Sequence, residues 1–349
     1  MTATARPVTL EDCENDEGEG SRAGRLIDSF GRIHNNLRIS VTDRCNLRCT
    51  YCMPEEVTFL DKSELLTFEE IVRIVQVAIP LGIDKIRLTG GEPLMRRDLP
   101  ILVGMLARLR GVHDLGLTTN ALLLADQAQS LFDAGLRRIN VSLDSLDRDR
   151  FRVLTRRDSL DRVLAGIDAA KATGFASIKI NAVVIRGVND CDVVALARFA
   201  RDWGLEIRYI EYMPLGADRW ARNKVFFAHE ILERLEKEIG PLSPAKEYDP
   251  RAPAMDFQFA DGGRIGIIAS VSRPFCNRCN RIRLTADGKL RNCLFALEET
   301  DIRPFVRGQI DDAGLVDAMC RTVRKKWAGH EINAASFVKP PRLMYSIGG

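Results

Sequence analysis

Six of the nine cysteines in this 349-residue sequence fall into two compact groups whose spacing suits metal ligation. The first group, with the spacing C-x3-C-x2-C, is Cys45, Cys49 and Cys52. The second group, with the spacing C-x2-C-x13-C, is Cys276, Cys279 and Cys293. Thiolates are soft donors that suit zinc or iron–sulfur clusters. Because such spacings fit metal sites better than disulfides, the sequence indicates a reducing, cytoplasmic location.

Each group supplies only three sulfur donors, and this number bears on the choice of metal. Structural zinc closes its coordination shell with four ligands. His34 precedes a strand that carries it to the far end, and no histidine follows the second group closely. Three cysteines on a four-iron cluster leave one iron open to chelate a small molecule. Two alternatives remain: a zinc knuckle completed by a distant residue, and Cys320 as a fourth ligand that closes the second site.

Several basic residues are expected at positions where a bound anion would offset the cost of burying their charge. Arg281 and Arg283 share one face of an extended strand beside the second cysteine group. Arginine forks pair well with phosphate or carboxylate oxygens, although a solvated edge strand is the alternative. Other basic residues interrupt the expected barrel strands, namely Arg38, Lys85, Arg87 and Lys179. Such residues are costly in a core unless an anion meets them, so the sequence predicts a phosphate-rich substrate.

Short apolar strands alternate with amphipathic helices through the first two thirds of the chain. Strands are expected at 37–41, 85–89, 114–118, 138–142, 177–184 and 206–211, and helices at 68–80, 99–109, 125–134, 160–173 and 191–203. This alternation requires parallel strands joined by crossover helices. Six β/α units fall short of a closed barrel, and a doubly wound sheet fits the count equally well. In either architecture, ligands bind where the strands end.

The alternation of strands and helices ends after a helix expected at 228–239. Residues 240–244 have the composition of a linker, 255–272 suggest paired strands, and a last helix is expected near 314–327. We therefore predict a barrel over 32–240 and a smaller domain with the second cysteine group over 241–349. Residues 1–31 carry three basic and seven acidic side chains, and we expect this segment to be disordered. The rest of the chain then carries a net charge of +7, which suits an anionic substrate.

The first cysteine group resembles the radical S-adenosylmethionine superfamily. Its third cysteine follows the aromatic Tyr51, and three further segments support the likeness: Gly90-Gly91-Glu92-Pro93, Ser142-Leu143-Asp144 and Glu211-Tyr212-Met213-Pro214. The resemblance implies an incomplete (β/α)6 barrel of the TIM type, which resolves the choice of α/β architecture. It also implies a 4Fe–4S cluster on Cys45, Cys49 and Cys52, whose open iron binds S-adenosylmethionine. The cofactor contacts that it implies are Tyr51, Gly91, Ser142 and Met213.

The two cysteine groups together resemble a narrower family, the GTP 3′,8-cyclases of molybdenum-cofactor biosynthesis. The Arg-x-Arg sequence between Cys279 and Cys293 and the terminal Gly348-Gly349 support this likeness over residues 30–349. It implies that a 5′-deoxyadenosyl radical removes the ribose 3′ hydrogen of GTP, after which that carbon attacks C8 of guanine. A second 4Fe–4S cluster, on Cys276, Cys279 and Cys293, would bind guanine.

The same family likeness assigns the substrate and catalytic residues. The implied GTP contacts are Arg38, Lys85, Arg87, Thr118, Lys179, Arg281, Ile282 and Arg283. The implied catalytic residues are Arg281, Arg283 and the tail residues Gly348 and Gly349, which would enter the active site.

The partners implied by this likeness are a homodimer mate, a flavodoxin or ferredoxin as electron donor, and cyclic pyranopterin monophosphate synthase as the downstream enzyme. The overall charge of +3 is too small to indicate nucleic-acid binding, and no run of about 18 apolar residues suggests a membrane span. Two competing functions remain. One is a radical enzyme that modifies a peptide, and the other is a zinc-stabilised binding module.

Overall fold

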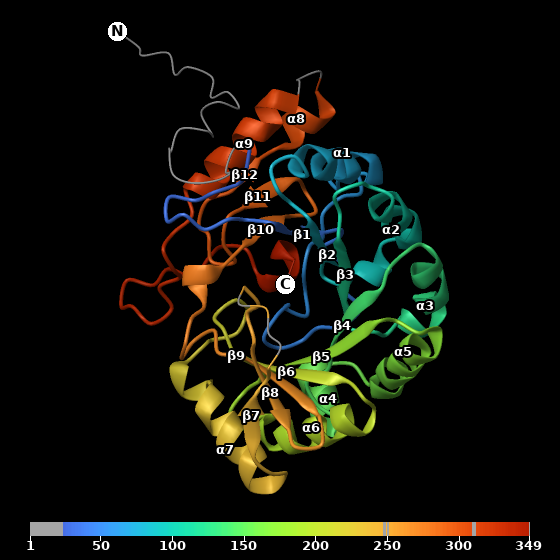
Figure 1. Cartoon of the computed structure of the whole chain (residues 1–349), viewed down its shortest axis with the longest axis vertical. Coiled ribbons are helices and arrows are strands. Elements are labelled where there is room, and N and C mark those ends of the chain that lie inside the picture. Colours follow the sequence, from blue (N-terminus) through green and yellow to red (C-terminus); the bar gives the residue numbers. More distant parts are fainter. Residues whose placement is uncertain (1–23, 247–248, 250, 309–311, 349) are drawn as a thin grey trace.

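The computed structural model describes residues 24–246, 249, 251–308 and 312–348. Its six central strands are parallel to their neighbours and curl into an incomplete barrel with helices on the outside (Figure 1). These strands are β1 (Asn36–Ser40), β2 (Lys85–Thr89), β3 (Asp114–Thr119), β4 (Arg138–Ser142), β5 (Ser177–Val184) and β6 (Glu206–Glu211). The predicted architecture is confirmed, and all six expected strands are present to within one residue at each end.

Residues after 240 extend both edges of this same sheet. One edge carries β9 (Arg264–Ile268) beside β6, followed by β8 (Met255–Phe259) and β7 (Leu242–Pro244). The other edge carries β10 (Arg281–Leu284) beside β1, followed by β11 (Lys289–Arg291) and β12 (Thr300–Asp301). The linker prediction is wrong for 242–244, because these residues pair with β8. The part of the chain expected to be a separate domain therefore shares one sheet with the barrel.

Helices cover the outer face, except for the C-terminal α10 (Met344–Ile347) inside the barrel, and the predicted ones occur in the predicted order. The helices are α1 (Phe68–Ala78), α2 (Leu99–Ala107), α3 (Leu124–Asp133), α4 (Arg148–Thr155), α5 (Leu160–Thr173), α6 (Val193–Asp202), α7 (Ala228–Glu238), α8 (Arg303–Arg307), α9 (Asp312–Arg324) and α10. Helix α1 starts where the sequence predicts, because the Thr67 hydroxyl accepts from Glu70 N–H at 3.2 Å. Helices α4, α8 and α10 were not predicted, since they are only eight, five and four residues long and bury few apolar side chains. No described helix has the length and apolarity needed to cross a membrane.

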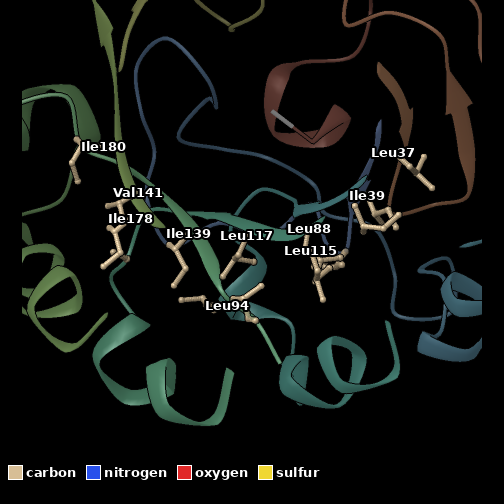
Figure 2. Packing of buried hydrophobic residues seen from close by; sticks show 14 of the residues in the cluster. Leu37, Ile39, Leu88, Leu94, Leu115, Leu117, Ile139, Val141, Ile178 and Ile180 are labelled. Carbon is tan, nitrogen blue, oxygen red and sulfur yellow. The ribbon is translucent and has the colours of Figure 1, made fainter. Parts of the chain in front are cut away.

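Successive side chains along each strand point alternately to the outer hydrophobic core and to the barrel interior. In β1, Leu37 and Ile39 are almost completely buried in the hydrophobic core, whereas Asn36 and Arg38 point the other way. Figure 2 shows the same outward layer of aliphatic side chains continuing through β2, β3, β4 and β5. Strand β10 pairs with β1 in parallel register and places Arg283 directly beside Arg38. The sheet thus directs one row of polar side chains inward and seals its other face with aliphatic ones.

The predicted disorder of residues 1–31 needs a correction at its end. Residues 1–23 lie outside the described residues. Leu26, by contrast, is 1% exposed, and its backbone N–H donates to Leu81 O at 3.0 Å. The Asp28 carboxylate is buried and accepts from Arg32 and from the backbone of Phe30. The charge of Asp28 is therefore compensated inside the fold, so residues 24–31 are ordered.

Candidate active site

The first cysteine group lies in the loop that follows β1, and we call its members the front cysteines (Cys45, Cys49 and Cys52). The backbone N–H groups of Cys52 and Met53 both donate to Cys49 O, at 2.9 and 3.0 Å, and this tight turn holds two of the thiols together. Burial raises the pKa of Cys45 to about 11 and that of Cys52 to about 12. A cationic cluster stabilises thiolates and displaces such protons, so the donor set fits iron–sulfur ligation.

Glycines let the segment after β2 lie directly against the cysteine loop. A Cβ at Gly91 would lie 2.5 Å from Arg44 O, and Gly91 N–H donates to Thr42 O at 2.8 Å. The next residue, Glu92, is buried and accepts from the Thr119 hydroxyl and Asn120 N–H, both at 2.7 Å. Burial raises the pKa of Glu92 to about 7. The Gly-Gly-Glu-Pro segment is thus a rigid support for the front cysteines and one wall of the adjoining cavity.

That cavity, the front cavity, is lined by the front cysteines and by the carboxyl ends of β2 to β5. Three of the predicted cofactor contacts line it, namely Tyr51, Gly91 and Ser142. The Tyr51 hydroxyl donates to Asp144 at 2.5 Å, and the second oxygen of Asp144 accepts from Val183 N–H at 2.8 Å. Asp144 thereby fixes the ring beside the cysteines. The structure places the fourth predicted contact, Met213, in a different cavity, described below.

Sequence reasoning missed Asn120 as a site residue. Its side-chain amide donates to Asn46 at 2.7 Å and approaches Cys45 Sγ at 3.8 Å, so it joins β3 to the cysteine loop. The next residue, Ala121, has a φ of 63°, a conformation that favours glycine. The only signal for Asn120 was its position directly after a strand.

The second cysteine group, called the rear cysteines (Cys276, Cys279 and Cys293), flanks β10 and β11 at the sheet edge beyond β1. These cysteines line a second cavity, the rear cavity, together with Met213, Phe275 and His330. Burial raises the pKa of Cys279, but Arg281 and Lys326 outweigh it and lower the value to about 6. The buried Lys326 ammonium lies 3.4 Å from Cys279 Sγ. Positive side chains thus stabilise a thiolate there.

The backbone around the rear cysteines is held by Arg32. Its guanidinium donates to Cys276 O at 2.6 Å and to Trp327 O and Ala328 O at 2.5 and 2.8 Å. Its Nε pairs with Asp28 at 2.6 Å. Nothing in the sequence pointed to this contact, since Arg32 is 244 residues away from Cys276.

We expect Arg32→Met to loosen the rear cluster selectively, because three backbone carbonyls lose their common donor. After anaerobic incubation with a chelator, the variant should lose about half of its iron while the front cluster remains. Iron analysis before and after treatment measures this. Arg137→Met is the matched control, because Arg137 also binds two backbone carbonyls, Phe132 O and Leu136 O. Equal iron loss in both variants would show that the effect is not specific.

Three arginines form a row across neighbouring strands above the rear cavity. Parallel register places Arg283 beside Arg38, and Arg38 beside Arg87. Burial, then the charge of Arg283, lowers the pKa of Arg38 well below its ordinary value. Gly116 continues the row on β3, and a Cβ there would lie 2.6 Å from the Arg87 guanidinium. The missing side chain makes room for Arg87.

Among the residues that the structure describes, this row forms no ion pair, although the charge of Asp114 partly offsets the burial that lowers the pKa of Arg87. Among the described residues, no carboxylate lies within ion-pair distance of Arg38, Arg87 or Arg283, and Arg38 Nε is buried without a hydrogen-bond partner. Burial lowers the pKa of Arg283 to about 9 and that of Arg87 to about 10. Cations held in this way favour binding of an external anion.

The other predicted basic residues line a third cavity, the basal cavity, at the opposite ends of the strands. Of these, Lys85, Arg87 and Lys179 line it, and Arg38 and Arg281 line both this cavity and the rear cavity, as does Arg208, which was not predicted. The sequence predicts that the charge of Lys179 needs an external anion. This prediction is wrong, because Lys179 pairs with Glu206 at 2.6 Å. Register places Glu206 beside Lys179 on the next strand, and Arg208 shares the same carboxylate. Lys85 contacts Asp249 at 3.4 Å.

Four residues line both the front and the rear cavity, namely Thr118, Asn181, Ile210 and Met344. They mark the boundary between the two cavities. Asn181, which sequence reasoning missed, has a buried side-chain oxygen without a partner. An unpartnered acceptor at this boundary is suited to a hydroxyl donor.

The tail reaches this interior, with the end of the described chain inside the barrel (Figure 1). Arg283 donates to Gly348 O, and a Cβ at Gly348 would lie 2.5 Å from Thr89 Oγ1. Gly349 lies outside the described residues. Ile282 differs from its predicted neighbours, because its side chain is 2% exposed and packs in the core on the opposite face.

Within the described ranges, no three His, Cys, Asp or Glu side chains converge closely enough to hold a single metal ion. None of the eight described cysteines takes part in a disulfide. Cys320 is buried in α9, Cys191 is exposed, and Cys13 lies outside the described residues.

Comparisons with known proteins agree with this arrangement. A family model described as the radical SAM superfamily matches residues 39–200, and one described as Molybdenum Cofactor Synthesis C matches residues 205–332. A GTP 3′,8-cyclase of Rhodopirellula baltica is 49% identical over 93% of this chain and 92% of its own length. One from Acidothermus cellulolyticus is 52% identical over 87% of this chain and 86% of its own.

Solved structures show the same fold at low sequence identity. SuiB of Streptococcus suis bound to S-adenosylmethionine matches with a TM-score of 0.57 and 14% identity, over 80% of this chain and 67% of that chain. The enzyme anSMEcpe with bound AdoMet matches with a TM-score of 0.52 and 13% identity, over 84% and 92%.

Proposed function

The chain belongs to the GTP 3′,8-cyclase family of radical S-adenosylmethionine enzymes, and we propose that its three cavities divide the substrates between them. It converts GTP to (8S)-3′,8-cyclo-7,8-dihydroguanosine 5′-triphosphate in molybdenum-cofactor biosynthesis. Its cofactors are S-adenosylmethionine and iron–sulfur clusters. The front cysteines would hold a cluster that supplies the electron for cleaving S-adenosylmethionine, and the rear cysteines would hold one that offers an open iron to the purine.

In this proposal S-adenosylmethionine occupies the front cavity. The front cysteines ligate one 4Fe–4S cluster beside it, and Tyr51, Gly91 and Ser142 contact the cofactor. Asp144 orients the Tyr51 ring through its short hydrogen bond. Met213 lines the rear cavity rather than the front cavity. We therefore propose that Met213 contacts S-adenosylmethionine only at the boundary where this cofactor adjoins GTP.

GTP then extends from the rear cavity into the basal cavity. The purine lies beside the rear cysteines, with Arg281 and Arg283 next to it, and the ribose lies at the boundary with Thr118 and Asn181. The triphosphate meets Arg38 and Arg87 and continues toward Lys85 and Lys179. The observation that carries this placement is the row of Arg38, Arg87 and Arg283, which forms no ion pair among the described residues. Ile282 contributes through its backbone alone.

The decisive experiment is an anaerobic assay of the cluster-loaded protein with GTP, S-adenosylmethionine and a reductant. Consumption of GTP with release of 5′-deoxyadenosine and the cyclised nucleotide is expected. Metal analysis should give about eight irons per chain. Stoichiometric zinc with no GTP consumption would favour a zinc-stabilised binding module instead. Cleavage of S-adenosylmethionine without GTP consumption would favour a peptide-modifying radical enzyme.

Arg283→Ala and Arg281→Ala should weaken GTP turnover by about 100-fold or more, because each removes a fork that binds anionic or polar substrate atoms. Iron content should stay unchanged, since neither side chain ligates a cluster. Initial rates and GTP binding by equilibrium dialysis measure the effect. Arg321→Ala is the control, because the Arg321 side chain is largely exposed on α9 and pairs with Asp317 of the same helix. Unchanged kinetics in both substitutions would remove them from the substrate site.

Family membership also leads us to propose a homodimer, a cytoplasmic location, a flavodoxin or ferredoxin as electron donor, and cyclic pyranopterin monophosphate synthase as the consumer of the product. The free cysteine thiols support a reducing compartment. Sedimentation of the cluster-loaded protein tests the dimer, and coupled assays with each donor test electron delivery.

A further inference from the structure

The tail that enters the barrel is fastened by one arginine just before it turns inward. Arg342 Nη2 pairs with Asp287 at 2.7 Å, and Arg342 Nε pairs with Glu299 at 2.7 Å. Asp287 lies in the turn between β10 and β11, and Glu299 lies just before β12. All three side chains are at most 21% exposed. Partly buried ion pairs of this kind hold geometry better than exposed pairs do.

The segment before Arg342 is stiff and has its own anchor. Lys339 donates to Gly216 O, and Pro340 and Pro341 follow it directly. Two prolines fix two backbone φ angles, so few conformations connect Lys339 to Arg342. The direction in which the chain leaves Arg342 is therefore set from both sides.

The segment after Arg342 forms walls of the two cavities. Met344 N–H donates to Leu215 O at 3.0 Å, and its side chain lines both the front and the rear cavity. Tyr345 lines the front cavity, and its N–H donates to Cys52. Ile347 is fully buried, and Gly348 O accepts from Arg283. Only Leu343 and the four-residue helix α10 lie between the arginine and this contact.

We propose that Arg342 is a positioning residue that latches residues 343–348 into the barrel by bridging Asp287 and Glu299. With the latch formed, Met344 and Tyr345 seal the boundary between the cavities, and Gly348 stays on Arg283. With the latch open, a four-residue helix is too short to hold itself in place. The tail then leaves, and both cavities gain contact with water.

Removing the arginine leaves neither carboxylate alone. Asp287 still accepts from the Thr285 hydroxyl at 2.6 Å, and Glu299 still pairs with the buried Arg291. Arg342→Met is therefore expected to fold and to bind both clusters, because no buried charge is orphaned. Its effect should be confined to the tail.

Hydrogen–deuterium exchange of the cluster-loaded protein, followed by mass spectrometry under anaerobic conditions, tests the latch. In Arg342→Met, peptides covering 343–348 should exchange at least about tenfold faster, while peptides from β1 to β6 keep the wild-type rate. Arg148→Met is the matched control, since Arg148 also bridges two carboxylates, Asp158 and Asp161, at 2.8 Å each. That control should leave tail exchange unchanged.

An unchanged tail rate in Arg342→Met, or an equal increase in Arg148→Met, overturns the proposal. If Arg342→Met exchanges faster throughout, Arg342→Lys decides, because lysine keeps the charge but reaches only one carboxylate. That variant should accelerate the tail alone and by less, and an unchanged tail rate in it again overturns the proposal.

The catalytic consequence rests on the proposed function and has a separate measurement. An unlatched tail should raise the ratio of 5′-deoxyadenosine to cyclised nucleotide several-fold, because water enters the boundary between the cavities. The exchange experiment needs no GTP, so a failure of the GTP assay would leave the test of the latch intact. Faster tail exchange with an unchanged product ratio would overturn the sealing role while retaining the latch.

Discussion

Cys276→Ala should abolish cyclisation while leaving the front cluster in place. The variant loses one of three rear ligands, so iron should fall from about eight to about four atoms per chain. Turnover of GTP should drop on the order of 1,000-fold or more, because the purine loses its anchor beside the rear cysteines. Reductive cleavage of S-adenosylmethionine should persist, since the front cysteines and the front cavity are untouched. Iron analysis and separate quantification of 5′-deoxyadenosine and cyclised nucleotide measure these outcomes.

The matched control is Cys320→Ala. Cys320 is a buried thiol of α9 with 5% exposure, and its loss should leave both clusters and turnover in place. Loss of about four irons in Cys320→Ala would instead identify it as a fourth ligand, and the rear site would then have no open iron for the purine. Full turnover in Cys276→Ala would exclude a role for the rear cluster.

The second large effect concerns stability and arises at Glu211, the last residue of β6. Its fully buried carboxylate accepts from Ala228 N–H at 2.9 Å and from the N–H groups of Val271 and Ser272 at 2.7 Å each. These contacts join the barrel to the start of α7 and to the segment that follows β9. Glu211→Ala leaves three backbone donors without an acceptor, and we expect the free energy of unfolding to fall by about 3–5 kcal/mol.

Thermal unfolding of the cluster-loaded protein under nitrogen measures this loss. The midpoint should fall by roughly 4–7 °C for a chain of this size. Glu233→Ala, an exposed position of α7, should change stability by no more than about 0.5 kcal/mol. A midpoint within a degree of the wild type for Glu211→Ala would mean that water or another side chain replaces the carboxylate.

Local patterns explain why so much of the site could be predicted. The spacing of Cys45, Cys49 and Cys52 is confined to eight residues, and the alternation that turns Arg38 inward needs only its own strand. The order of strands and helices follows from periodicity, and each of the six parallel strands appears where it was expected.

Long-range pairing explains what was missed. Arg32 meets Cys276, Glu206 neutralises Lys179, and Arg342 meets Asp287 and Glu299, all across distances that periodicity does not encode. The composition of residues 240–244 indicated a linker, but β7 forms within this segment. Pro244 is tolerated there because β7 is an edge strand, where a missing backbone N–H costs nothing. Asn181 belongs to no sequence motif. Its position between the two cavities becomes evident only in the folded structure.

The pairing of β10 with β1 and of β9 with β6 has a consequence for biosynthesis on the ribosome. β1 begins at Asn36 and its outer partner at Arg281, so about 245 residues are translated between them, on the order of 10–50 s at ordinary rates. Until then both flanks of the nascent barrel offer unpaired backbone groups to other chains. A fragment ending at residue 240 should therefore aggregate, and the growing polypeptide should need chaperone protection until its last third emerges.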